Sequence, residues 1–428
     1  MRGLLRLVWA GLYLLPLIVA STAGAQSSAS SPVRLWSQET QLRDVRDPDV
    51  VRGVWVTRWE YSSPESVTAL LSRAAARGLT DVFFQVRGRA DAFYRSSLEP
   101  WGEELTGILG RDPGWDPLEV AVREAGARGL RLHAWINTFP IWNSHRPPPE
   151  TSPRHVYLDH PDWIMSNRIG QTQRLGNRFG YVSASPGNLE VQAHIEAVVL
   201  DIVSRYDVDG IHFDYIRLPD QDYSYDAVSR GRFLRESHDE TYMEWQANEI
   251  SGMLERISRS ARAIRPGLIM TAAIVNHYHR AVGIFAQDPA VWIASGAIDY
   301  VIPMAYTPSR TEFASMVEGY RDVLDRDQMA VGINLEEMPN DPYTVAAQIH
   351  ETVRAGTRGH VFFSQESLDY LARSGAAGGD LYSYLEGVRG SRFVVAERVR
   401  RAVQMPPIEV LLRPAVAVTV VLAVLLLP

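Results

Sequence analysis

The feature that most constrains the fold of this chain is a repeated alternation of short β-rich apolar runs with amphipathic stretches. Between the runs, apolar residues recur at helical spacing, as at positions 195, 198, 199 and 202. Eight such repeats over about 340 residues predict a (β/α)8 barrel. The predicted strands span residues 54–59, 81–86, 131–137, 210–214, 269–275, 300–306, 330–335 and 360–363.

An open, doubly wound sheet is the competing architecture. It is disfavoured because no glycine-rich phosphate loop follows any predicted strand, and because the strand count reaches eight. Three glycines that precede strands, Gly78, Gly129 and Gly359, are expected to be helix C-caps. Long insertions are expected after the second strand (residues 88–117) and the third (residues 139–186), at the end of the barrel where active sites form.

Two absences narrow the chemistry that is available to the chain. It has no cysteine and no lysine, so all 43 of its basic residues are arginine. Thiolate nucleophiles, zinc–thiolate sites, Schiff bases and the lysine of phosphate loops are therefore excluded. The net charge of −7 gives no electrostatic reason to bind nucleic acid. We expect no cofactor, and the reactive groups must come from Asp, Glu, His, Ser, Thr, Tyr or a metal.

The N-terminal end of the chain predicts export, whereas the role of the C-terminal end stays open. Residues 1–25 have the positive start, apolar stretch and small-residue cleavage site of a signal peptide, with an uncleaved anchor as the alternative. We interpret residues 26–50 as a linker, 51–390 as the barrel and 391–428 as a C-terminal extension. Its apolar tail, residues 415–427, is shorter than the ~20 residues of a spanning helix. A tail anchor and a segment lying on a membrane surface or on the domain therefore both remain open. The expected location is the periplasm or cell envelope.

Polar side chains at the ends of the predicted strands should form a ring at one end of the barrel. They are Glu60, Gln85, Arg87, His133, Asn137, Asp214, Arg217, Asn276, His277, Tyr306, Asn334, Glu336, Gln365 and Glu366. Aromatic residues are interleaved with them: Trp55, Trp59, Tyr94, Trp101, Trp135, Trp142 and Tyr215. Aromatic faces beside amide, guanidinium and carboxylate groups suit sugar rings, which present an apolar face and many hydroxyls. Trp55 and Trp135 are also explained as core residues.

Residues 207–217 carry the strongest signal. The alternation of the strand at 210–214 points His212 and Asp214 into the barrel, with Asp214 at its upper end. Burying a carboxylate there is costly unless it is paired, and Arg217 or Arg87 could supply the partner. We interpret Asp214 as a functional carboxylate, with a structural Asp–Arg pair as the alternative. His212 is better explained as a satisfied core histidine than as a catalyst.

Several ordered sequence blocks resemble the glycosyl-hydrolase-like family 10 group of bacterial envelope proteins. They are Arg52-Gly53-Val54-Trp55, Phe84-Gln85-Val86-Arg87, Asp91-Ala92-Phe93-Tyr94 with Ser97 and Pro100-Trp101, Asp116-Pro117-Leu118, His133-Ala134-Trp135-Ile136-Asn137, the stretch from Asp209 to Asp214, and Pro303-Met304-Ala305-Tyr306. The resemblance covers residues 52–388 and implies a TIM barrel, export and action on bacterial glycans. Within the group it implies peptidoglycan strands stripped of stem peptides as the substrate.

A contrast with chitinase-type barrels limits the mechanism. Their fourth strand resembles Asp-Gly-x-Asp-x-Asp-x-Glu, but His212 stands here at the first inner Asp and Ile216 at the final Glu. Substrate-assisted hydrolysis by that pair of acids is therefore not expected.

Glycoside hydrolysis normally uses two carboxyl groups. We assign Asp214 as nucleophile or base and choose Glu336, after the seventh strand, as the general acid. Glu60 is a reserve candidate, Glu366 is also explained by the dipole of the eighth helix, and Asp288 by an N-cap. The predicted substrate-binding residues are Gln85, Arg87, Tyr94, His133, Asn137, Arg217, Asn276 and Tyr306.

Two other functions stay open. A non-catalytic glycan-binding barrel would keep the aromatic cleft without an acid–base pair. A metal-dependent deacetylase would use His133, His212 or His277, although no compact motif of two histidines and a carboxylate is present. In the favoured interpretation the partner is a polysaccharide, with no nucleic acid.

Overall fold

The fold is an eight-stranded parallel sheet that is nearly closed into a barrel, as the sequence predicted. The computed structural model describes residues 49–236, 239–320, 322–339 and 341–375. The strands lie in the order β8-β7-β6-β3-β2-β1-β10-β9, and isolated parallel bridges from Val301 to Met329 and from Met304 to Gly332 link β8 to β9. The strands are β1 (Val51–Val56), β2 (Asp81–Arg87), β3 (Arg131–Asn137), β6 (Gly210–Asp214), β7 (Ile269–Ile274), β8 (Tyr300–Pro303), β9 (Ala330–Asn334) and β10 (Gly359–Phe363).

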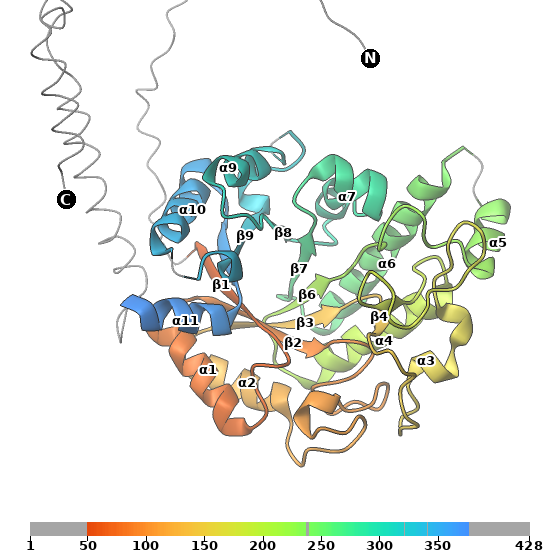
Figure 1. The fold of residues 1–428 in the computed structure, drawn as a ribbon, viewed down its shortest axis with the longest axis horizontal. Helices are drawn as coiled ribbons and strands as arrows, with labels where there is room; N and C mark the ends of the chain where they lie inside the picture. The colour runs from red at the N-terminus through yellow and green to blue at the C-terminus, as the bar shows by residue number, and fades with distance from the viewer. Residues whose placement is uncertain (1–48, 237–238, 321, 340, 376–428) are drawn as a thin grey trace, which may run out of the picture. The chain divides into compact units, whose positions relative to one another are not determined.

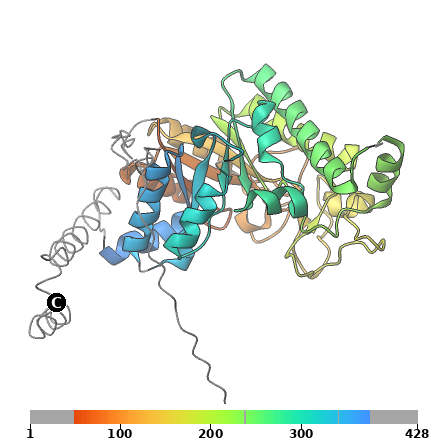
Figure 2. The ribbon, with the colours of Figure 1, turned by 90° about the horizontal axis from the view of Figure 1, so that it is seen from above.

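Helices lie around the strands (Figures 1 and 2). They are α1 (Pro64–Ala76), α2 (Pro117–Gly126), α4 (Leu189–Arg205), α6 (Tyr242–Ile264), α7 (Tyr278–Phe285), α8 (Pro289–Ala294), α9 (Arg310–Glu318), α10 (Pro342–Ala355) and α11 (Gln365–Gly375), with α3 (Val156–Asp159) and α5 (Ala227–Glu236) farther out. Local sequence sets where several of them begin. Asp116, for example, accepts hydrogen bonds from the backbone N–H groups of Leu118 and Glu119, and Pro117 starts α2.

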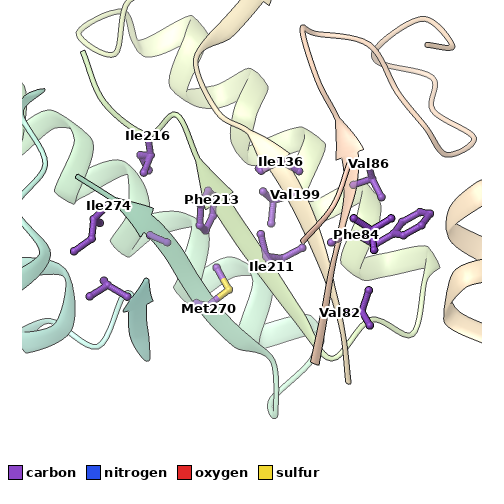
Figure 3. Packing of buried hydrophobic residues seen from close by; sticks show 14 of the residues in the cluster. Val82, Phe84, Val86, Ile136, Val199, Ile211, Phe213, Ile216, Met270 and Ile274 are labelled. Atoms are coloured by element: carbon purple, nitrogen blue, oxygen red, sulfur yellow. The ribbon is translucent and has the colours of Figure 1, made fainter. Parts of the chain in front are cut away.

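Two hydrophobic layers hold the barrel. On β6, the side chains of Ile211 and Phe213 point outward and pack with Val199 of α4 and Met270 of β7 (Figure 3). The residues of β6 that alternate with these two point into the barrel, where a smaller apolar cluster includes Trp55. The predicted alternation of the fourth strand is therefore confirmed.

His212 belongs to the barrel interior. Its Nε2 accepts a hydrogen bond from the indole N–H of Trp55 at 3.0 Å, so its Nδ1 carries the proton and donates to the Thr271 hydroxyl at 2.9 Å. Burial lowers the pKa of His212 well below its usual value. The interpretation of His212 as a satisfied core histidine is confirmed.

One glycine explains a close approach between two strands, and one prediction about the glycines was wrong. Gly78 and Gly129 follow helices in the left-handed conformation, as expected. Gly359 is not a cap: Gly356 ends α10, while Gly359 lies in β10 with φ of 144°. A Cβ atom there would overlap the carbonyl group of Val51 on β1, which is why the strand pair requires glycine.

The two long loops follow β2 and β3, as predicted. The first contains the 3₁₀ turn η1 (Glu103–Leu105). The second contains α3, the turn η2 (Pro161–Trp163) and a ribbon of β4 (Pro140–Trp142) and β5 (Val182–Ser183). Later turns are η3 (Arg326–Gln328) and η4 (Leu335–Glu337).

The predicted signal peptide, nearly all of the linker, the end of the predicted barrel after residue 375 and the C-terminal extension lie outside the described residues. Among the helices that are described, none has both the length and the apolar character needed to cross a membrane.

Candidate active site at the carboxyl ends of the strands

A pocket of about 160 Å³ opens where the strands end at the upper face of the barrel, and we call it the Asp214 pocket. Side chains that follow or end β1, β2, β3, β6, β8 and β10 meet there. Its lining comprises Trp55, Thr57, Arg58, Trp59, Gln85, Trp135, Asn137, Tyr181, Asp214, Tyr215, Arg217, Ala273, Met304, Tyr306 and Phe363.

Asp214 ends β6 and faces this pocket while only 7% of the residue is exposed. Its Oδ1 accepts hydrogen bonds from the backbone N–H of Tyr215 at 2.6 Å and from Nη1 of Arg217 at 3.4 Å. Burial raises the pKa of Asp214, and the positive charge of Arg217 is the largest opposing effect. The side chain is therefore a partly desolvated carboxyl group that remains open to a ligand.

Two neighbours shape the surroundings of this carboxyl group. Tyr215 adopts φ of 49°, a left-handed conformation that is costly for an aromatic residue, and Arg217 stacks on its ring at 4.4 Å. The indole N–H of Trp135, which is buried, faces Asp214 and helps to lower its pKa but has no hydrogen-bond partner of standard geometry. A buried donor without a partner at a pocket wall is suited to a ligand hydroxyl.

Five predicted site residues meet in the Asp214 pocket: Asp214, Gln85, Asn137, Arg217 and Tyr306. The two amides are held in place, since Nε2 of Gln85 donates to Oδ1 of Asn137 at 3.3 Å and Nδ2 of Asn137 donates to the carbonyl of Gly88 at 3.0 Å. Fixed amides of this kind can orient the hydroxyls of a sugar.

Three of the other pocket residues, Arg58, Trp59 and Tyr181, were not among the predicted substrate-binding residues, and Arg58 contacts the other two. Trp59 is 61% exposed at the pocket, and one face of its ring lies 3.9 Å from the guanidinium carbon of Arg58. Arg58 is wholly buried and donates to Glu104 at 3.0 Å, while Tyr181 lies within 3.4 Å of its Nη2. Trp59 did stand among the aromatic residues singled out in the sequence. No pattern in the sequence indicated that Arg58 and Tyr181 are site residues, because their surroundings depend on how the two long loops fold back.

The structure does not bring Arg87 or Tyr94 to the pocket. Arg87 is 1% exposed and makes a bidentate ion pair with Glu99, whose oxygen lies 2.8 Å from Nη2, so it cannot pair with Asp214. Its Nη1 also donates to the carbonyl groups of Asn137 and Thr138. Tyr94 is fully buried, in edge contact with the ring of Tyr206 at 5.9 Å. The loop after β2 encloses both side chains.

His133 and Asn276 are also placed away from the pocket. His133 is fully buried near the amino ends of the strands, where its Nε2 lies 2.9 Å from the carboxylate of Asp81. Its ring occupies the space that a side chain at Gly210 would need. Asn276 is half-buried and donates to the sulfur of Met316 at 3.5 Å. These contacts give both residues structural roles.

The carboxyl groups considered for the general acid differ in position. Glu336 lies in η4 with an exposed side chain outside the pocket lining. Burial is the main cause that raises the pKa of Tyr306, and the charges of Asp214 and Glu336 add to it. Glu60 accepts hydrogen bonds from the backbone N–H groups of Thr57 and Glu366, each at 2.6 Å, and burial raises its pKa to about 7. Asp288 is the N-cap of α8, as predicted.

Within residues 49–236, 239–320, 322–339 and 341–375, no three His, Asp or Glu side chains are grouped so that they could hold a metal ion. The deacetylase hypothesis needs such a set of three ligands, and these described ranges do not provide one.

Comparison with known proteins supplies the family. The family model described as Glycosyl hydrolase-like 10 matches residues 50–333, about two thirds of the chain. The chain belongs to the glycosyl hydrolase-like 10 family. The matched region includes Asp214 and all the predicted substrate-binding residues, and it ends just before Glu336.

Relatives of this glycosyl hydrolase-like 10 chain come from distant bacteria. The Escherichia coli K12 protein named Glycosyl hydrolase DigH is 28% identical over 339 residues, which cover 66% of this chain and 72% of that protein. The Bacillus subtilis protein named Glycosyl hydrolase YngK is 28% identical over 299 residues, covering 63% of this chain and 54% of the relative.

A solved structure agrees with the barrel of this glycosyl hydrolase-like 10 chain. It is alpha-L-fucosidase isoenzyme 2 from Paenibacillus thiaminolyticus, with a TM-score of 0.54 at 12% identity. The match covers 76% of this chain and 48% of that one. At this identity the likeness supports the fold alone.

Proposed function

We propose that the protein is an exported glycoside hydrolase that cleaves bacterial envelope glycan, namely peptidoglycan strands lacking stem peptides. The observation that carries the proposal is the position of Asp214: a buried carboxyl group, held by Arg217, that opens into an aromatic-walled pocket at the end of a barrel strand. Membership of the glycosyl hydrolase-like 10 family supports the reaction class. The sequence of residues 1–25 supports export.

The walls of the pocket suit a saccharide. The exposed ring of Trp59 offers a flat apolar surface, and Arg58 covers its other face. Gln85 and Asn137 present fixed amides from the ends of neighbouring strands. A sugar ring stacked on Trp59 would place its hydroxyls against these polar groups and its anomeric carbon toward Asp214.

In the proposed reaction, ionised Asp214 acts as nucleophile or as the base that activates water, and a second carboxyl group protonates the leaving oxygen. We propose Glu336 for the second role, because it lies in η4 directly after β9, at the same carboxyl end of the barrel where Asp214 ends β6. Glu60 is the competing candidate, since its pKa of about 7 suits a proton donor near neutral pH.

Two variants separate these candidates. If Glu336 is the acid, Glu336→Gln lowers kcat by about 100-fold or more, while Glu60→Gln acts chiefly on stability. Substrates with a good leaving group, such as aryl glycosides, need no proton donor, and they should restore much of the lost rate in the variant of the true acid only. If aryl glycosides restored the rate of Glu60→Gln rather than that of Glu336→Gln, Glu60 would be the general acid.

The reaction is tested by incubating the purified full-length protein with peptidoglycan strands freed of their peptides and counting new reducing ends. The proposal expects reducing ends to accumulate in proportion to enzyme and time, and shorter oligosaccharides to appear by mass spectrometry. Strands that carry stem peptides serve as the matched comparison and should be cleaved more slowly.

A non-catalytic glycan-binding barrel is the second candidate, and one observation favours it: Asp214 is the only carboxylate that lines the pocket among the described residues. A binding protein would retain the strands in a pull-down without releasing any reducing end. That outcome would contradict the hydrolase and support the second candidate.

A further inference from the structure

A second cavity, of about 340 Å³, adjoins the Asp214 pocket, and we call it the Phe179 pocket. Its volume falls in the range of small-molecule sites. It shares the side chains of Tyr181, Tyr215 and Arg217 with the Asp214 pocket. The remaining lining residues are Pro140, Phe179, Ser183, Leu218, Pro219, Val275 and Phe285.

The wall between the two pockets is a pair of tyrosines. The rings of Tyr181 and Tyr215 meet edge to face with centroids 5.2 Å apart. Tyr181 comes from the loop after β3 and Tyr215 from the end of β6, so the wall is formed by segments far apart in the sequence. A polymer bound across this wall would place adjacent units in adjacent pockets.

Arg217 is the one charged side chain in the lining of the Phe179 pocket. Its guanidinium group makes a single long hydrogen bond, to Asp214 at 3.4 Å, among the contacts of the described residues. The nearby carboxylate of Asp220 is already paired with Arg178 at 2.6 Å. Most of the donors of Arg217 are therefore available to an anion, in a cavity whose other lining residues, apart from Ser183, are apolar or aromatic.

We propose that the Phe179 pocket is a second saccharide subsite, which binds a sugar bearing a carboxylate substituent and pairs that carboxylate with Arg217. The inference rests on the proposed function and makes its substrate class more specific. In peptidoglycan the lactyl ether of muramic acid ends in a carboxylate, and attachment of a stem peptide converts this group into an amide. The apolar walls would receive the methyl and acetyl groups of the same sugar.

This assignment gives a physical reason for discrimination between stripped and peptide-bearing strands. A free lactyl carboxylate can accept two hydrogen bonds from the planar guanidinium group of Arg217. An amide at the same position has no charge and accepts less strongly, and a stem peptide would also need room beyond the wall formed by Pro140, Leu218 and Phe285. Loss of the charge alone should therefore weaken binding.

The test measures binding rather than turnover, so that its result is independent of the hydrolysis assay. The full-length Asp214→Asn protein is titrated by calorimetry with two oligosaccharides of alternating N-acetylglucosamine and N-acetylmuramic acid. One has free lactyl carboxylates, and the other has each carboxylate converted to its N-methylamide. We expect the free acid to bind about tenfold more tightly, or better.

Three double variants, each combining Asp214→Asn with one further substitution, show which residue causes the preference for the free acid. Arg217→Gln should reduce the preference for the acid to less than about twofold. Arg168→Gln, which removes an exposed arginine paired with Asp222 outside both pockets, is the matched control and should keep the preference. Phe179→Ala should weaken binding of both oligosaccharides. Melting temperatures establish that each protein is folded.

Equal affinity for the acid and the methylamide in the Asp214→Asn protein would overturn the inference, as would the absence of binding by either one. It would also be overturned if Arg217→Gln kept the preference, or if Phe179→Ala left both affinities unchanged. Failure of the proposed function has a different signature: the wild-type protein would then release no reducing ends from stripped strands, whatever the calorimetry shows.

Discussion

At the scale of single residues, Trp59 is the side chain whose exposure calls for an explanation. It is 61% exposed beside the pocket, and the buried guanidinium of Arg58 supports one face of its ring. An aromatic ring held in place with one face open is the arrangement that sugar binding needs. An exposed tryptophan contributes little to the free energy of unfolding, so its role can be tested without loss of the fold.

We expect Trp59→Ala to raise KM for glycan strands by about tenfold with a small effect on kcat, because a stacking surface is lost while the reacting groups stay in place. Steady-state kinetics on strands of defined length measure both parameters. Ile169→Ala, which removes a 77% exposed side chain that lines neither pocket, is the control. If both variants behaved like the wild type, Trp59 would have no part in substrate binding.

Glu60 is the residue that makes stability depend on pH. Burial raises its pKa from the usual 4.5 to about 7, so the folded state holds this proton more tightly than the unfolded state does. The contribution of Glu60 to stability is therefore fully present below pH 4.5 and is lost as the pH rises through 7.

We predict that the melting temperature of the wild type falls relative to that of Glu60→Gln as the pH rises from 5 to 8, by the equivalent of about 1–3 kcal/mol. Glu60→Gln stays neutral throughout and serves as the reference. Scanning calorimetry at several pH values measures the difference. A constant difference across this range would show that the carboxyl group of Glu60 titrates as it does in an unfolded chain.

At the scale of elements, the barrel strands could be predicted and the contacts of the loops could not. The predicted bounds of the third and fourth strands agree with β3 and β6 residue for residue. The first strand begins at Val51 rather than at residue 54, because residues 51–53 pair with residues 359–361 of β10 although they form no apolar run. The spacing of apolar residues and the local composition indicate which residues form a strand, because a barrel strand carries apolar residues on both faces.

Three of the five predicted residues that line the pocket were found where a strand points a side chain directly into it, and Arg217 and Tyr306 follow the ends of β6 and β8 by three residues. Asp214, Gln85 and Asn137 were found because each ends or nearly ends a strand on its inward face. Arg87 also stands at a strand end, but Glu99, twelve residues later in the loop after β2, turns its side chain away. No local pattern in the sequence signals such a pairing, because it depends on the path of the loop.

The ion pair of Arg87 and Glu99 joins three elements: β2, the loop that follows it, and the end of β3. Both side chains are almost completely buried, and Arg87 holds the carbonyl group of Asn137 as well. Removing Arg87 would leave the charge of Glu99 buried, with only His194 Nε2 at 2.9 Å as a remaining partner.

We expect Arg87→Met to lower the free energy of unfolding by about 3–5 kcal/mol and to reduce activity, since Asn137 loses its support. Denaturant unfolding measures the loss. Arg123→Met, which breaks an exposed ion pair with Glu124, is the matched control and should change stability by less than about 0.5 kcal/mol. Similar losses in the two variants would mean that burial of the Arg87 pair has no energetic consequence.

At the scale of the whole molecule, the nearly closed sheet is what assembles the site. Gln85 and Asp214 are far apart in the sequence, yet they line one pocket because parallel strands bring their carboxyl ends to the same face. The family match and the likeness in fold agree with this architecture. Location in the cell is a property of the whole chain as well, and the sequence of residues 1–25 predicts it.

When the full gene is expressed in a Gram-negative host, we predict that the protein appears outside the cytoplasm with Gln26 as its first residue, because cleavage follows Ala25. N-terminal sequencing of the periplasmic and membrane fractions tests this. Ala25→Arg should block processing, and protein that begins at Met1 in every fraction of the wild-type culture would contradict the predicted signal peptide.

We propose that a desolvated carboxyl group at the end of β6 performs glycoside hydrolysis, and measuring both activity and stability of Asp214→Asn is the sharpest test of this role. Because burial raises the pKa of Asp214, removing its charge should not weaken the fold. We predict that Asp214→Asn releases reducing ends more slowly than the wild type by a factor of about 1000 or more. Its melting temperature should stay within about 2 °C of the wild-type value. Wild-type activity in this variant, or a large fall in melting temperature, would contradict it and would make Asp214 a structural partner of Arg217.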